Sequence, residues 1–361
     1  MAETGGVIPS VPTTISPLRA MAWRARFRAW LGRHPVVFVA LLSPGIVEYL
    51  SGSSRLDGLV IAPPLFLLFL AGNLGLYVPG VLLIREARRR WRGGWGTVVL
   101  LGIAYAITEE GLALSTLFNP QASVVGALGS YGHYLGVSWV WLVGVVAVHV
   151  VFSISIPILL FDLAFPDRRS APLVGATGLR LALGALAVTT SAFMALIYAA
   201  RHFFAGWPIV LGSLAAIGTL TFAAYSLPRS VLRPFRPEPS RAPVTFALIG
   251  LAFWPSLLLV QGLLGVAGAP ALVTVLALGA GLLGYLYVVL SGIGRRSNER
   301  HLIALVVGLV LPLLVVAAVI EFRVPVILIA EGAAAWFFLF LWRRYRPRPG
   351  AKSTAVGAIP G

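Results

Sequence analysis

WGTVVLLGIAYAITEEGLALSTLF, residues 95–118, is an apolar run of membrane-spanning length that contains two adjacent carboxyl groups, Glu109 and Glu110. A charged side chain near the centre of a bilayer costs roughly 2.5–3.5 kcal/mol on insertion scales, so an uncompensated pair costs on the order of 5–7 kcal/mol. We therefore expect groups that compensate the pair among the other polar residues of the membrane-spanning runs.

The composition of the chain is that of a protein whose solvent is the membrane. Its 361 residues are 58% hydrophobic and only 11% charged, and the mean hydropathy is +0.91. These values predict an all-α, polytopic integral membrane protein. The chain has no cysteine, which excludes disulfides, thiolate metal sites and cysteine nucleophiles.

Ten apolar runs are long enough to cross a hydrocarbon core of roughly 30 Å, which takes about 20 helical residues. They lie near residues 35–51, 59–84, 95–118, 137–162, 179–200, 207–227, 244–266, 270–293, 301–321 and 324–342. The first run is marginal, because Ser43, Pro44 and Gly45 interrupt it and Glu48 lies near its outer end.

The basic residues follow the alternation of these runs. Every second loop is rich in arginine, and all but three of the 28 basic residues fall on one side, the exceptions being Arg55, Arg201 and Arg323. Cytoplasmic loops collect arginine and lysine, so the pattern predicts ten spans with both termini in the cytoplasm and the protein in the cell membrane. Membrane topology also explains the formal net charge of +16, and nucleic acid is not expected as a partner.

The Pro- and Arg-rich segment RSVLRPFRPEPSRAP, which spans residues 229–243, is expected to be a cytoplasmic hinge between two helical bundles. The chain is expected to consist of five parts, namely a basic amphipathic cytoplasmic segment (1–34), a first bundle with the candidate site (35–228), the hinge (229–243), a second bundle (244–342) and a cytoplasmic tail (343–361).

A histidine in the next run is expected to meet the two glutamates. At about 1.5 Å per residue, Glu109 and Glu110 lie roughly 13 Å below the outer boundary and His149 roughly 18 Å below it. Antiparallel neighbours then bring the three within about one turn, with Ser153 one turn further on. A regular helix places Tyr105 and Thr116 on the face of Glu109, with Glu110 about 100° away. Glu48, in the first run, is either a third acid of this region or an interfacial residue, and Asn73 marks an irregular second helix that could line the same cavity.

Glu109, Glu110 and His149 form a candidate catalytic group. A carboxyl group in apolar surroundings holds or passes a proton near neutral pH, and an imidazole beside it can share that proton or donate to a developing oxyanion. The alternative is a structural cluster that joins the third and fourth spans through hydrogen bonds to Tyr105, Thr116 or His149. Glutamates and histidines could also supply zinc ligands, but no HExxH-type spacing exists, and the sequence defines no metal or cofactor.

The glutamate pair and the following histidine resemble the CPBP family of CAAX-processing and bacteriocin-processing intramembrane proteases. The first motif of that family is EExxxR, and here Glu109 and Glu110 are present with Leu114 in the arginine position. The second motif is FxxxH, and here Val145 precedes His149; the third is HxxxN, where Ser153 is the nearest polar substitute. The resemblance implies that a glutamate activates water, that His149 assists at the oxyanion, and that a membrane peptide is cut.

Two other classes of function use the same residues. A proton-coupled transporter or permease would use the glutamates and His149 as a relay for a small-molecule substrate, and a membrane assembly subunit would use them only for packing. The bilayer is the partner that the sequence identifies, whereas the sequence defines neither the substrate nor the oligomeric state.

Overall fold

The computed structural model describes residues 30, 33–296, 298–320 and 325–346, and within them the fold is all-α, as predicted. Nine of the described helices are long and apolar enough to cross a membrane, and the apolar helix Pro35–Tyr49 is shorter. The length and apolar composition of these helices therefore support a multi-pass membrane protein. Most of the expected basic segment 1–34, and the tail beyond residue 346, lie outside the described residues.

The elements follow one another with short connections. In the first half they are α2 (Pro35–Pro44), η1 (Gly45–Tyr49), α3 (Gly58–Ile61), α4 (Pro63–Arg90), α5 (Trp95–Ala106), η2 (Ile107–Ala113), η3 (Gly126–Gly129), β1 (His133–Tyr134), β2 (Val137–Ser138), α6 (Trp139–Val148), η4 (His149–Ser155), α7 (Ile156–Ala164) and η5 (Pro166–Arg168). The others are α8 (Ala176–Arg201), α9 (Trp207–Ser226), α10 (Pro243–Val266), α11 (Ala271–Gly292), α12 (Glu299–Ile320) and α13 (Pro325–Arg344).

Prolines and residues with positive φ mark several helix ends. Pro63 and Pro243 open α4 and α10, where the first-turn N–H has no partner within the helix and proline has no N–H. At the other end of a helix, His202 ends α8 in the left-handed conformation at φ 51°. Gly206, at φ 87°, then turns the chain into α9. The local sequence thus ends and restarts the two outer helices within a few residues.

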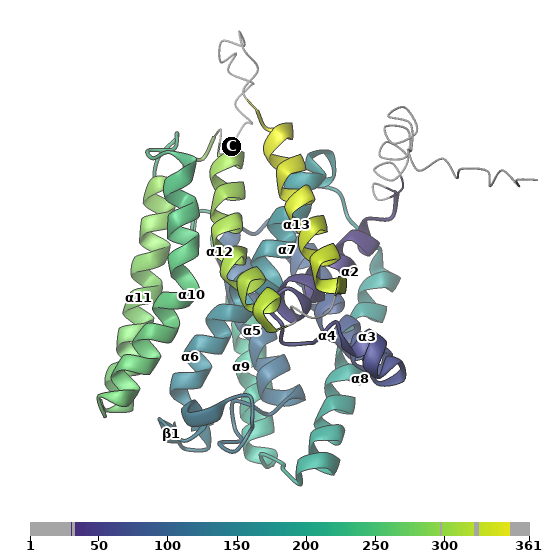
Figure 1. Cartoon of the computed structure of the whole chain (residues 1–361), viewed down its shortest axis with the longest axis vertical. Coiled ribbons are helices and arrows are strands. Elements are labelled where there is room, and N and C mark those ends of the chain that lie inside the picture. Colours follow the sequence, from purple (N-terminus) through teal and green to yellow (C-terminus); the bar gives the residue numbers. More distant parts are fainter. Residues whose placement is uncertain (1–29, 31–32, 297, 321–324, 347–361) are drawn as a thin grey trace, which may run out of the picture.

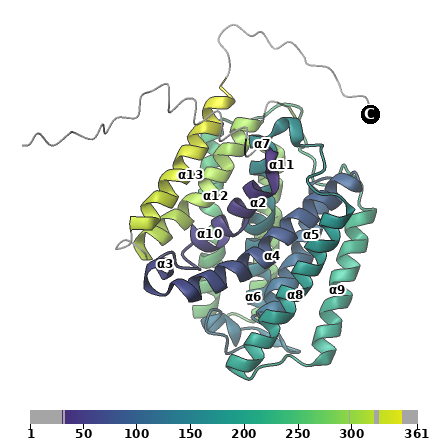
Figure 2. The ribbon, with the colours of Figure 1, turned by 90° about the vertical axis from the view of Figure 1, so that its right-hand side faces the viewer.

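The helices form an inner group and an outer group. Helices α5, α6 with α7, and α12 bury much of their surface, whereas α8, α9, α10, α11 and α13 expose apolar side chains such as Val188, Phe222 and Leu283. Helices α10 and α11 run side by side along one flank and α8 lies toward the other (Figure 1). The view turned by 90° shows α13 on one side and α9 on the other (Figure 2). Apolar side chains exposed over these outer helices fit contact with lipid.

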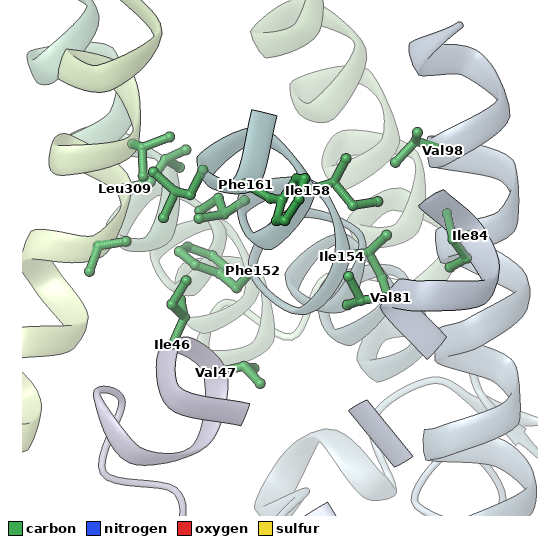
Figure 3. Packing of buried hydrophobic residues seen from close by; sticks show 14 of the residues in the cluster. Ile46, Val47, Val81, Ile84, Val98, Phe152, Ile154, Ile158, Phe161 and Leu309 are labelled. Atoms are coloured by element: carbon green, nitrogen blue, oxygen red, sulfur yellow. The ribbon is translucent and has the colours of Figure 1, made fainter. Parts of the chain in front are cut away.

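The apolar core surrounds the chain that runs from η4 into α7. Phe152, Ile154, Ile158 and Phe161 are fully buried there. Figure 3 shows side chains from four other elements around them, namely Ile46 and Val47 of η1, Val81 and Ile84 of α4, Val98 of α5 and Leu309 of α12. The core therefore fixes the segment that carries His149 from several sides.

Helices α10 and α12 cross at very close range through two glycines. A Cβ on Gly250 would lie 2.3 Å from the carbonyl oxygen of Leu305, and one on Gly308 would lie 2.0 Å from that of Ala247. Small residues at a crossing let helix backbones approach closely, which is the usual basis of helix association in lipid.

The arginine-rich segments meet at one end of the molecule. Arg85 donates to the carbonyl of Arg168 at 2.9 Å, and Arg295 donates to that of Pro234 at 2.9 Å. Similar contacts join the segments 85–94, 164–174, 229–241, 294–301 and 343–345. We refer to this side as the arginine-rich end.

Candidate functional site

The helical segments that carry the acids and the histidine of the candidate site all depart from regular α-helical geometry. Among the described residues, three π-helical turns carry its polar side chains: η1 holds Glu48, η2 holds Glu109 and Glu110, and η4 holds His149 and Ser153. The wider turn is visible in the backbone hydrogen bonds, since the amide after η1 and the amide after η2 each bond five residues back at 2.8 Å. π-Turns are rare and occur frequently at functional sites.

Proline gives a local reason for the turn at η4. Pro157 stands in the first turn of α7, directly after η4. It has no N–H for the carbonyl of Ser153, and its ring would clash with that carbonyl in a regular helix. A π-turn widens the helix at this point and relieves the clash.

The imidazole of His149 lies between the two carboxyl groups. Its Nε2 is 2.8 Å from Oε1 of Glu110 and hydrogen-bonded to it. On the other side of the ring, Nδ1 pairs with the Ser153 hydroxyl at 2.9 Å and lies 3.0 Å from Oε2 of Glu109. That Glu109 oxygen accepts no hydrogen bond from the described residues, so its contact with the imidazole is electrostatic. The structure thus brings together the three residues that the sequence singled out.

The second oxygen of Glu110 is bound by Thr116. The Thr116 hydroxyl donates to Oε2 of Glu110 and also lies 3.2 Å from the Glu110 carbonyl. Trp141 of α6 donates its indole N–H to the same hydroxyl at 3.2 Å. Both oxygens of Glu110 are therefore hydrogen-bonded, whereas Oε2 of Glu109 lies against the imidazole without a well-oriented hydrogen bond from the described residues.

A third carboxyl group, Glu48, lies next to this cluster. Its two oxygens accept from the hydroxyls of Tyr77 and Ser54, each at 2.5 Å, and Asn73 donates to Ser54 at 3.1 Å. The Tyr77 ring stacks on the His149 ring with centroids 6.5 Å apart and planes at 15°. The structure therefore brings Glu48 and Asn73, both candidates from the sequence, to the edge of the same polar cluster.

The cluster is enclosed by protein. Glu109, Glu110 and His149 expose only 1%, 7% and 4% of their surface. None of the three lines the large cavity that the described residues form between α5–α7 and α10–α12. Within the described part of the chain, no three His, Asp or Glu side chains are arranged to hold a metal ion. The cluster presents carboxyl, imidazole and hydroxyl groups at hydrogen-bond distance from one another.

Two other buried acids of the first half, Glu86 and Asp162, belong to the arginine-rich end. Glu86 lies 3.1 Å from Arg85 and accepts from the amide of Leu173 at 2.8 Å. Asp162 lies 3.2 Å from Arg88. These ion pairs tie α4 to α7 and to the loop after it, and they contact no residue of the cluster around His149.

Thr116 bonds a glutamate, as the structural alternative expected, but regular helical geometry predicted the wrong face for it. It placed Thr116 on the face of Glu109, but Thr116 bonds Glu110, because η2 is a π-turn and the helix ends at Ala113. Ser115 then adopts a positive φ of 57°, which folds Thr116 back onto Glu110. Tyr105, expected as a hydrogen-bond partner, has a hydroxyl without a partner among the described residues, although its ring centroid lies 6.4 Å from that of His149.

Sequence reasoning did not identify Tyr77 or Trp141. Each lies on an apolar helix and reaches the cluster through a single polar atom. An aromatic residue of this kind is indistinguishable from a core residue until the helices are assembled.

No protein family, no curated protein and no solved structure matches this chain. The arrangement of the site itself therefore carries the functional argument.

Proposed function

We propose that the protein is a divergent intramembrane protease of the CPBP type that cuts a membrane peptide with a glutamate-activated water. The observation that supports this most is the position of His149, which contacts a glutamate on each side inside a group of apolar helices. An acid/base pair for water activation needs a carboxylate and an imidazole within hydrogen-bond reach of one another.

The contacts suggest a different role for each glutamate. Glu110 uses one oxygen to orient the imidazole through Nε2 and the other to bind Thr116, so it acts as a positioning residue. Glu109 has a free acceptor oxygen beside Nδ1, so it is the better general base. In the reaction, Glu109 takes a proton from water and the hydroxide adds to the peptide carbonyl to form a tetrahedral oxyanion. The oxyanion then collapses, the C–N bond breaks, and the proton passes through His149 to the amine that leaves.

Three departures from the family pattern define how this site would work. Leu114 replaces the arginine of the first motif, Val145 replaces the aromatic residue of the second, and Ser153 stands where the third has asparagine. Ser153 contacts Nδ1 of His149 at 2.9 Å, so the serine would orient the imidazole directly. Thr116 and Trp141 supply hydrogen bonds to Glu110 that do not come from these motifs.

Substitution of the three residues tests the proposal. Glu109→Gln, Glu110→Gln and His149→Ala should each abolish cleavage, and the Glu110→Gln/His149→Ala double variant should cost little more, because residues that act as one unit are strongly non-additive. The readout is a proteomic search for membrane peptides that accumulate in cells with each variant. Glu331→Gln, the same change in α13, is the matched control. If neither glutamine variant alters the membrane proteome, the protease proposal is rejected.

A proton relay coupled to transport is the second candidate function. It is favoured by the placement of carboxyl groups on both sides of one imidazole, with Glu48 and Tyr77 extending the line of proton-bearing groups. In proteoliposomes, a relay predicts proton flux that follows an imposed pH gradient and is lost in His149→Ala. A protease predicts no such flux.

We further infer that the chain crosses the cell membrane ten times with both termini in the cytoplasm. The supporting observation is that the arginine-rich segments meet at one end of the molecule. The short helix α2 begins at that end, where Phe38 packs on Phe165 with ring centroids 5.0 Å apart, and η1 carries the chain to the depth of His149. The positive-inside rule assigns the arginine-rich end to the cytoplasm.

A further inference from the structure

An elongated cavity of about 1580 Å³ separates the helices α5–α7 from α10–α12. Most of its wall is apolar, with Ile103 and Val150 on one side and Leu286 and Leu309 on the other. The volume exceeds the roughly 300–1,000 Å³ of an ordinary small-molecule pocket. Its size and apolar lining fit a molecule with long hydrocarbon chains.

The cavity runs along the membrane normal rather than across it. On α11 its lining extends from Gly279 to Ile293, which is roughly 20 Å of helix at 1.5 Å per residue. Near the other end of α11, Thr274 and Leu278 are buried, so this helix is packed there. The cavity therefore reaches from the arginine-rich end into about two thirds of a hydrocarbon core of roughly 30 Å.

The mouth of the cavity is basic. Arg233, Arg295 and Arg296 belong to its lining at the arginine-rich end, together with Glu238. Arg295 is held by the carbonyls of Pro234 and Phe235 at 2.9 and 3.0 Å, which fixes the loop.

The other two arginines are available to a ligand. Arg233 and Arg296 are exposed, and neither makes a side-chain hydrogen bond or ion pair with the described residues. Trp95 also lines the cavity, and an aromatic residue of this kind is typical of the membrane–water interface.

We propose that this cavity, which we call the groove from here on, binds an anionic glycerophospholipid. The phosphate headgroup would lie between Arg233 and Arg296, and the acyl chains would lie along the apolar wall formed by α5–α7 and α11. The combination of a basic mouth, an apolar body and an orientation along the membrane normal matches the shape and charge of such a lipid. A zwitterionic lipid has the same chains but lacks the net negative charge, and it should bind less tightly.

The binding test compares dioleoylphosphatidylglycerol with dioleoylphosphatidylcholine, which differ only in the headgroup. Native mass spectrometry of the full chain in detergent should give tighter binding of the first lipid. The Arg233→Gln/Arg296→Gln variant should weaken binding of dioleoylphosphatidylglycerol roughly 10- to 30-fold, because each of the two arginines adds a similar electrostatic attraction to the anionic headgroup. The control Arg236→Gln/Arg241→Gln removes the same charge from the same loop outside the lining and should change binding by at most about threefold.

A matched pair of glycines tests the apolar body. A Cβ on Gly279 or on Gly281 of α11 meets nothing within 4 Å, and of the two only Gly279 lines the groove. Gly279→Phe should therefore fill the groove and weaken dioleoylphosphatidylglycerol binding about tenfold, whereas Gly281→Phe should leave it unchanged.

Four results would overturn the proposal. These are equal binding of the two lipids by the unmodified protein, equal losses in the two arginine double variants, no effect of Gly279→Phe, and a protein dimer that dissociates on Gly279→Phe. The last would mean that a second copy of the chain fills the groove. Because Glu110→Gln leaves the groove intact, lipid binding by that variant separates this proposal from the protease proposal.

Discussion

Thr116 connects two helices to one carboxyl group. Its hydroxyl donates to Glu110 and accepts from the indole of Trp141 at 3.2 Å, while Thr116 itself is 3% exposed. A single hydroxyl thus fixes the orientation of Glu110 and holds α6 against the end of η2. The other oxygen of Glu110 is hydrogen-bonded to Nε2 of His149 at 2.8 Å.

Replacing Thr116 by valine keeps the shape of the side chain and removes both hydrogen bonds. We expect Thr116→Val to lower the free energy of unfolding by about 1–3 kcal/mol, since membrane hydrogen bonds contribute roughly 0.6–2 kcal/mol each. Thr116→Ser keeps the hydroxyl and should retain most of the stability. Tryptophan fluorescence during thermal unfolding in detergent measures both, and equal stability of the valine variant and the unmodified protein would contradict the role given to this hydroxyl.

The contact between His149 and the two glutamates could be predicted from the sequence, whereas the residues that surround this contact could not. Counting residues along two antiparallel apolar runs was enough to bring His149 to the depth of Glu109 and Glu110. The predicted face of Thr116 was wrong because the count assumed 100° per residue, and a π-turn changes that rotation. Tyr77 was not identified because its ring packs like any core residue.

At the scale of elements, the close crossing of α10 and α12 can be tested directly by a substitution at Gly308. A methyl group on Gly308 would lie 2.0 Å from the carbonyl oxygen of Ala247, and a backbone atom cannot move aside as a flexible side chain can. We expect Gly308→Ala to separate the helices and to destabilise the protein by about 1–3 kcal/mol, the usual cost of overpacking.

Gly262 of α10 provides the control for this prediction. A Cβ there meets nothing within 4 Å, so Gly262→Ala should be neutral or slightly stabilising, because alanine has the higher helix propensity by about 1 kcal/mol. Thermal unfolding of the two variants under one condition gives the comparison. Equal unfolding temperatures for Gly308→Ala and Gly262→Ala would mean that the crossing contributes nothing.

The lengths of the apolar runs predicted where the long helices of the described structure lie. They did not predict where those helices depart from regular α-helical geometry. The expected run 137–162 corresponds to one continuous helical path from Trp139 to Ala164, and only the structure reveals the π-turn within it. The expected run 95–118 is helical only to Ala113, because residues beyond it turn back toward Glu110. Hydropathy measures the cost of exposing a segment to water, and that cost is nearly the same for an α-turn, a π-turn or a buried loop.

At the scale of the whole molecule, the site and the groove lie on opposite sides of the same helices. Val150 lines the groove, whereas the neighbouring His149 contacts the glutamates, so η4 separates the two regions. Gly102 lets this wall pack tightly, since a Cβ there would lie 3.2 Å from Val150. The proposed ligand binding in the groove and the proposed chemistry at His149 would therefore be separate properties of one group of helices.

The orientation of the molecule in the membrane can be tested directly because the chain contains no cysteine. Ala127 and Pro237 are both exposed, and they lie in the loop before α6 and at the arginine-rich end. Pro237 contributes a backbone carbonyl that accepts from the amide of Arg296 at 3.0 Å, and a cysteine keeps that carbonyl. In intact cells, an impermeant maleimide should label Ala127→Cys and not Pro237→Cys, because arginine-rich loops remain in the cytoplasm. Permeabilised cells should label both, which controls for the accessibility of each thiol, and equal labelling of both in intact cells would reject the ten-span topology.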